Sequence, residues 1–130
     1  MRGIDAVTWA GIALSVGCTS LGQVLLKLGM MQPAVQAAMS DGSALPLTQA
    51  VIVQPRLLAG LLLYAAAALS WMLVLGRVEL SFAYPFVGLG FVLVLVLSWL
   101  WLGEVPGLAR LLGSFLVVAG VLLVARSSAA

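Results

Sequence analysis

Almost the whole chain consists of four apolar segments, each about as long as a helix that crosses a lipid bilayer. A bilayer core about 30 Å thick requires about 20 apolar residues of helix. The segments cover residues 6–28, 57–76, 82–102 and 108–125. Hydrophobic residues make up 64% of the 130 residues and charged residues 8%, whereas an ordinary soluble domain has about 25% charged residues. We therefore expect an all-α membrane protein with four transmembrane helices.

Short connections restrict how these helices can be arranged. Residues 77–81 and 103–107 are too few to cross a bilayer, so the second, third and fourth helices must form antiparallel hairpins. The first connection, a loop over about residues 32–54, is the only long one, and its second half is apolar enough to lie in the membrane interface. We expect a single transmembrane domain over residues 1–130.

The basic residues do not decide the orientation in the membrane. The cytoplasmic side normally carries the excess of lysine and arginine. One side here carries Arg2, Arg77 and Arg126, and the other carries Lys27, Arg56 and Arg110. With both short tails on the same side, we expect both termini in the cytoplasm.

Several functional classes are disfavoured by residues that the chain lacks. It has no histidine and a single cysteine, Cys18, so the usual metal sites and an intrachain disulfide have no residues to form them. The basic residues are scattered and form no nucleic-acid patch. A catalytic nucleophile, base and orienting group cannot be assembled either. We expect no metal, no cofactor, no nucleic-acid partner and no enzymatic activity.

A polar stripe runs along the first predicted helix. Ser15, Thr19, Gln23 and Lys27 recur every four residues, on one slowly drifting face of a helix. A charge at the bilayer centre costs about 2.5–3.5 kcal/mol on insertion scales, so such residues usually face a cavity or another subunit. The alternative is a packing surface from which Lys27 reaches the headgroups. We favour binding for Gln23 and Lys27; packing is favoured for Ser15 and Thr19, with Thr19 kept as a candidate for substrate contact.

None of the four segments contains an acidic residue. The acids Asp5, Asp41, Glu79 and Glu104 all occur in tails or connections. Exporters of organic cations commonly need a buried anionic site, whereas this chain offers a cation, Lys27, which suits phosphate or another anion. The electrostatics therefore favour an anionic substrate.

Aromatic and small residues supply further candidates. Tyr84 precedes Pro85 at the start of the third helix, and Gly88 and Gly90 follow. Because proline removes a helical hydrogen bond, Pro85, Gly88 and Gly90 are predicted to form a hinge. An aromatic belt with ordinary close helix packing fits the same residues equally well. Trp71 in the second helix is a candidate for stacking on a sugar, or for packing.

The fourth helix carries a predicted association surface. Gly113 and Gly120 lie seven residues apart on one face and allow another helix to approach closely. Four helices enclose little volume, so we expect a translocation path to need a second subunit.

In their order and spacing, these motifs resemble a known family. They are Gly22-Gln23 followed by Lys27, then Ala83-Tyr84-Pro85, Gly103-Glu104, and Gly113 with Gly120. The combination covers nearly the whole chain and is similar to the four-helix drug/metabolite transporters, and among them to the aminoarabinose-phosphoundecaprenol flippase subunits. The resemblance implies a bundle of the small multidrug resistance type that works as a homodimer, or as a heterodimer with a homologous four-helix subunit.

The resemblance also implies a function. Such a flippase moves an undecaprenyl-phosphate-linked sugar from the inner to the outer leaflet of the bacterial inner membrane. In the best-known case the sugar is 4-amino-4-deoxy-L-arabinose, which is later transferred to the lipid A of lipopolysaccharide and reduces the binding of polymyxin. On this hypothesis Lys27 meets the phosphate, while Gln23, Tyr84 and Trp71 bond to or stack on the sugar.

Two alternatives compete with the flippase. The first is a proton-coupled exporter of cationic drugs or metabolites. Multidrug members of the superfamily carry an essential glutamate in the first helix, where this chain has Gly17-Cys-Thr-Ser20. The second is a non-transporting assembly subunit, against which the polar stripe argues.

Overall fold

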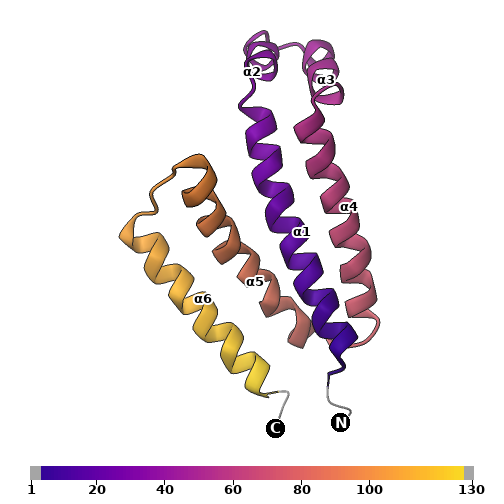
Figure 1. Ribbon diagram of the computed structural model, residues 1–130, viewed down its shortest axis with the longest axis vertical. Helices are drawn as coiled ribbons and strands as arrows, with labels where there is room; N and C mark the ends of the chain where they lie inside the picture. The colour runs from indigo at the N-terminus through magenta and orange to yellow at the C-terminus, as the bar shows by residue number, and fades with distance from the viewer. Residues whose placement is uncertain (1–3, 128–130) are drawn as a thin grey trace.

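The computed structural model describes residues 4–127, which form helices and short connections (Figure 1). Four helical spans within this range are long and apolar enough to cross a membrane. They are α1 (Ala6–Met30), α4 (Pro55–Leu75), α5 (Leu80–Leu97) with its π-helical continuation η1 (Ser98–Leu102), and α6 (Leu108–Ser127). Each span begins and ends within two residues of an apolar segment of the sequence. The expected all-α fold with four transmembrane helices is confirmed.

The four spans form two hairpin-like pairs that are inclined to each other. Helices α1 and α4 lie side by side, while α5 and α6 form a second antiparallel pair that leans away from them toward the end where α2 and α3 lie (Figure 1). The start of α1 and the end of α6 lie at the opposite end of the molecule (Figure 1). The two helix pairs therefore lie closest together at the end of the molecule where α1 begins (Figure 1).

The hydrophobic core explains this inclination, because it lies toward the end that holds the start of α1. Its buried members are Ile12, Val16, Val74, Phe82, Ala83, Phe86 and Val121. Trp9 of α1 packs edge-on against Phe86 of α5, with the ring centroids 5.4 Å apart. Burial of large aromatic side chains is strongly stabilising, so the first turns of α5 are fixed against α1 while its far end diverges.

Glycines and small hydroxyls bring α1 and α4 into close contact. A Cβ atom added to Gly22 would lie 3.1 Å from the carbonyl oxygen of Gly60, and one added to Gly60 would lie 3.1 Å from the carbonyl oxygen of Gly22. The Ser15 hydroxyl donates to the Ala67 carbonyl at 3.0 Å, and the Ser70 hydroxyl donates to the Gly11 carbonyl at 2.9 Å. Close small-residue packing and interhelical hydrogen bonds are what hold helices together within a bilayer.

The long first connection is helical for most of its length. It contains α2 (Pro33–Ser40) and α3 (Ala44–Ile52), separated by a turn in which Gly42 has a φ of +73°. Met39, Leu45 and Ile52 are exposed on these helices. Short helices that expose apolar side chains next to transmembrane ends fit the membrane interface.

An ion pair joins the start of α1 to the α4–α5 connection, at the end of the molecule opposite α2 and α3. Asp5 is the N-cap of α1 and accepts hydrogen bonds from the backbone N–H of Thr8, at 3.1 Å, and from the Thr8 hydroxyl. Its second carboxylate oxygen lies 2.9 Å from Arg77 Nη1 in the α4–α5 connection. The Thr8 hydrogen bonds, with a smaller contribution from the Arg77 charge, lower the pKa of the Asp5 carboxyl below its ordinary value.

Candidate functional site

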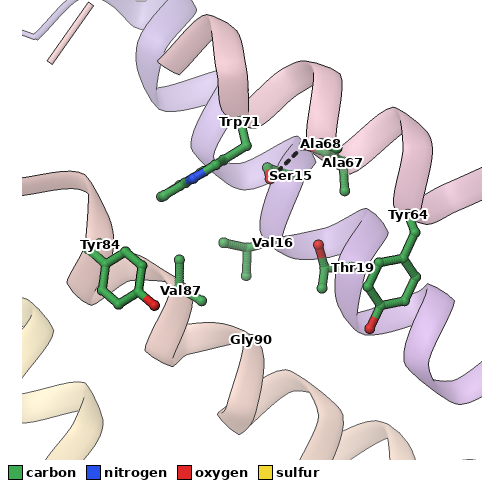
Figure 2. Close-up of a pocket in the computed structure, with 10 residues that line it drawn as sticks. All are labelled: Ser15, Val16, Thr19, Tyr64, Ala67, Ala68, Trp71, Tyr84, Val87 and Gly90. Carbon is green, nitrogen blue, oxygen red and sulfur yellow. Dashed lines mark hydrogen bonds between the residues drawn. The ribbon is translucent and has the colours of Figure 1, made fainter. Parts of the chain in front are cut away.

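A cavity of about 290 Å³ lies between α1, α4 and α5 (Figure 2). We call it the aromatic cavity. Trp71 extends from α4 into the space between α4 and α5, and Tyr84 faces the same region from α5 (Figure 2). The cavity is lined by Ser15, Val16, Thr19, Tyr64, Ala67, Ala68, Trp71, Tyr84, Val87 and Gly90. An apolar lining with a few hydroxyl and indole groups suits a ligand with both apolar and polar surfaces.

A second cavity, of about 200 Å³, lies where α1 and α5 have diverged, near the α5–α6 connection. We call it the charged cavity. It is lined by Gln23, Val24, Lys27, Val94, Ser98, Leu102 and Glu104. The Lys27 ammonium nitrogen lies 4.0 Å from Glu104 Oε1, and the two side chains are 56% and 46% exposed. One cation, one anion, an amide and a hydroxyl thus surround a single accessible space.

The backbone that carries Glu104 is defined by an irregular end of α5. The helix widens into the π-helical turn η1, and Gly103 ends that turn with a φ of +69°, which glycine adopts at little cost. The backbone N–H of Glu104 then donates to the Ser98 carbonyl at 3.2 Å. Glu104 also lines an adjoining cavity of about 230 Å³ that includes Arg110. Glu104 therefore borders two cavities, one lined by Lys27 and the other by Arg110.

The structure divides the five predicted binding residues between the two cavities. Thr19, Trp71 and Tyr84 line the aromatic cavity, whereas Gln23 and Lys27 line the charged cavity. Thr19 and Lys27 are eight residues apart on one helix, which corresponds to about 12 Å along its axis. Trp71 is farther still, because its neighbour Ser70 bonds to Gly11 in α1. In this structure Lys27 and Trp71 line different cavities.

The predicted hinge residues lie within a continuous helix and make packing contacts. Pro85 occurs inside α5, which continues through it. A Cβ atom added to Gly88 would lie 3.0 Å from Val117 of α6, and one added to Gly90 would lie 3.5 Å from the Ser20 hydroxyl of α1. These contacts match the close-packing alternative, and hinge motion stays a prediction.

The glycines of the predicted association surface are open in the single chain. Among residues 4–127, a Cβ atom added to Gly113 or Gly120 would meet nothing within 4 Å outside its own stretch of helix. Phe115, Leu116 and Leu123 on the same helix are exposed. α6 therefore has apolar surface that is free for lipid or another subunit.

Two residues of the cavities were not among the predicted binding residues. Tyr64 contributes a ring to the aromatic cavity, and Glu104 contributes the only carboxylate of the charged cavity within residues 4–127. For Glu104 the signal was the pair Gly103-Glu104 directly after an apolar helix. Because Glu104 is far from Lys27 along the chain, the ion pair between them could not be predicted from the sequence.

These features define a class of protein. Four membrane-spanning helices, in two inclined pairs that leave cavities between them, form a multi-pass membrane protein of the small four-helix transporter type.

Comparison with known proteins identifies the family. The chain is 40% identical over 117 residues to a protein of Erwinia tasmaniensis named as a probable 4-amino-4-deoxy-L-arabinose-phosphoundecaprenol flippase subunit ArnF, covering 85% of this chain and 87% of the relative. It is 37% identical over 110 residues to the corresponding probable subunit ArnE of Pseudomonas aeruginosa, covering 85% and 90%. No family model and no solved structure matches the chain. The chain belongs to the family of 4-amino-4-deoxy-L-arabinose-phosphoundecaprenol flippase subunits.

Proposed function

We propose that this chain is one subunit of a flippase that moves 4-amino-4-deoxy-L-arabinose-phosphoundecaprenol from the inner to the outer leaflet of the bacterial inner membrane. The names of its relatives specify this lipid. The structural observation that best supports the proposal is Lys27, a cation on a membrane-spanning helix that lines an accessible cavity. A phosphate in a membrane needs such a counter-charge. The protein acts as a transporter, not as a catalyst.

The two cavities suggest successive positions for the headgroup. The phosphate would first bind Lys27, with Gln23 hydrogen-bonded to the headgroup, in the charged cavity. The headgroup would then pass to the aromatic cavity, where Trp71 and Tyr84 stack on or bond to the sugar. The undecaprenyl tail would stay in the surrounding lipid throughout. Rocking of the α5–α6 pair against α1 and α4 would exchange access between the leaflets.

A second four-helix subunit would complete the path. The relatives carry two different subunit names, ArnE and ArnF, which supports a heterodimer of homologous chains. The exposed apolar surface of α6 with Gly113 and Gly120 is the proposed contact. Both termini would lie in the cytoplasm.

Flipping can be measured through the amine of the sugar. The protein is extracted from its own membrane with its accompanying subunits and reconstituted into vesicles of phosphatidylcholine and phosphatidylglycerol, which contain no amine that such a reagent labels. A membrane-impermeant reagent that labels amines then reports how fast 4-amino-4-deoxy-L-arabinose-phosphoundecaprenol, included in the vesicles, reaches their outer leaflet. Lys27→Gln is expected to slow flipping at least about tenfold, because the phosphate loses a charge-assisted contact, and Lys27→Arg should retain more activity.

Arg56→Gln is the matched control. It removes one positive charge from the same end of the molecule at an exposed position that lines neither cavity. Equal rates for Lys27→Gln and the wild type would refute the role of Lys27. Absence of lipid flipping together with drug-dependent proton flux would instead favour the cation exporter.

A further inference from the structure

We infer that Glu104 is a specificity-determining residue, whose carboxylate binds the ammonium group of the sugar while Lys27 binds the phosphate. This inference rests on the proposed function, because it takes the ligand from that proposal. It assigns a ligand contact to an acidic residue that the sequence alone placed only in a connection.

The geometry of the ion pair is suited to exchange with a ligand. Lys27 and Glu104 are 4.0 Å apart, at the outer limit of an ion pair, and both side chains are about half exposed. A separated and accessible pair of this kind contributes little to stability. Opening it for a ligand therefore costs little, while both charges stay in the lining of the cavity.

The ligand carries the complementary charges. A 4-amino-4-deoxy sugar linked through phosphate to a lipid has an ammonium group at one end of the sugar and an anionic phosphate at the other. When it enters, one internal ion pair would be replaced by two pairs with the ligand, and the charges in the cavity would stay balanced. Gln23 and Ser98 line the same cavity and offer hydrogen bonds to the remaining hydroxyl groups.

The same carboxylate would act against the wrong lipids. A polyprenyl phosphate without an amine, or with an acylated amine, would place its negative charge near Glu104 without supplying a cation for it. Repulsion of an unwanted ligand is a common basis of specificity. Arg110 lines the adjoining cavity together with Glu104, but it does not line the charged cavity itself.

The placement of Glu104 by its backbone supports a positioned role. Three features fix the position of the Glu104 backbone. They are the π-helical turn, the positive φ of Gly103 and the hydrogen bond from the Glu104 N–H to the Ser98 carbonyl. By contrast, Glu79 in the other short connection also precedes a membrane helix but has no ion pair recorded within residues 4–127.

The test compares two lipids that differ in one charge. The probes are 4-amino-4-deoxy-L-arabinose phosphate linked to a short prenyl chain and the same lipid with its amine acetylated. Their Kd values are measured for the protein with its accompanying subunits in lipid nanodiscs. The wild type is expected to prefer the amine at least about tenfold, as for one charge-assisted hydrogen bond. Glu104→Gln should bring the ratio of the two Kd values close to one, and Glu104→Asp should restore part of it.

The remaining variants separate the possible outcomes. Lys27→Gln should weaken both lipids by a similar factor and so leave the ratio nearly unchanged. Glu79→Gln makes the same substitution at the opposite end and should alter neither Kd. If Glu104→Gln, shown by its unfolding transition to be folded, keeps the wild-type ratio, the inference is overturned while the proposed function stands. If the wild type binds neither lipid, the proposed function fails as well.

Discussion

Replacement of Gly22 by alanine is expected to destabilise the contact between α1 and α4. The added Cβ atom would lie 3.1 Å from the Gly60 carbonyl oxygen and 3.0 Å from a ring carbon of Tyr64. The tyrosine ring can rotate, but the carbonyl belongs to the backbone of α4. The two helices must therefore separate by a few tenths of an ångström along their closest contact.

The size of the effect follows from two opposing contributions. Overpacking of a well-packed contact typically costs about 1–3 kcal/mol. Alanine in place of glycine within a helix returns about 0.5–1 kcal/mol through the backbone entropy of the unfolded chain. The difference leaves an expected loss of stability for Gly22→Ala of up to about 2.5 kcal/mol.

Gly17→Ala provides the matched control in the same helix. A Cβ atom at Gly17 would meet nothing within 4 Å in the described part of the chain beyond its own stretch of helix, so this variant receives the gain in helix propensity without the steric cost. The difference between the two variants should be about 1–3 kcal/mol, because the propensity contribution cancels. Reversible unfolding in mixed micelles with increasing dodecyl sulfate, followed by tryptophan fluorescence, measures both. Equal stabilities of the two variants would refute the close approach of α1 to α4.

Two further predictions concern the ends of the fold and its α6 surface. Thr8 hydrogen bonds lower the pKa of the Asp5 carboxyl. The stabilising contribution of the ionised carboxylate should therefore be complete above the ordinary aspartate pKa, and it should be lost as the pH falls through the lowered pKa. Asp5→Ala should remove this part of the acid unfolding profile, and an unchanged profile would contradict the assignment. Gly120→Leu should leave the fold of one subunit intact, because the site is open, yet weaken subunit association several-fold in single-molecule photobleaching. Undiminished association would exclude this face of α6.

The spans could be predicted from the sequence because their determinants are local. About 20 consecutive apolar residues specify a spanning helix whatever the rest of the chain does, and short connections specify antiparallel neighbours. The helices α2 and α3 were harder to predict. Each has fewer than ten residues, and neither N-cap, Gln32 or Ser43, makes a side-chain capping bond. Their apolar character was visible, but their helical form was not.

The candidate site could be predicted only in part, for a reason that the stripe on α1 illustrates. Its four-residue spacing correctly places Ser15, Thr19, Gln23 and Lys27 along α1, but that spacing says nothing about what faces them. The structure joins Ser15 to the Ala67 carbonyl and brings Lys27 near Glu104. Both partners come from other helices or connections. The widened η1 turn that precedes Glu104 arises within Ser98–Leu102, where the residue types give no signal of it.

The ends of the first and last spans have a consequence for gene fusion. Because α1 begins and α6 ends at the same end of the molecule (Figure 1), two such subunits joined head to tail by a short peptide are forced to insert into a membrane with the same orientation. An opposite orientation would require an additional span in the linker. Covalent tandem proteins, with and without such a ninth span, can therefore report whether two of these chains work side by side in parallel or as an inverted pair.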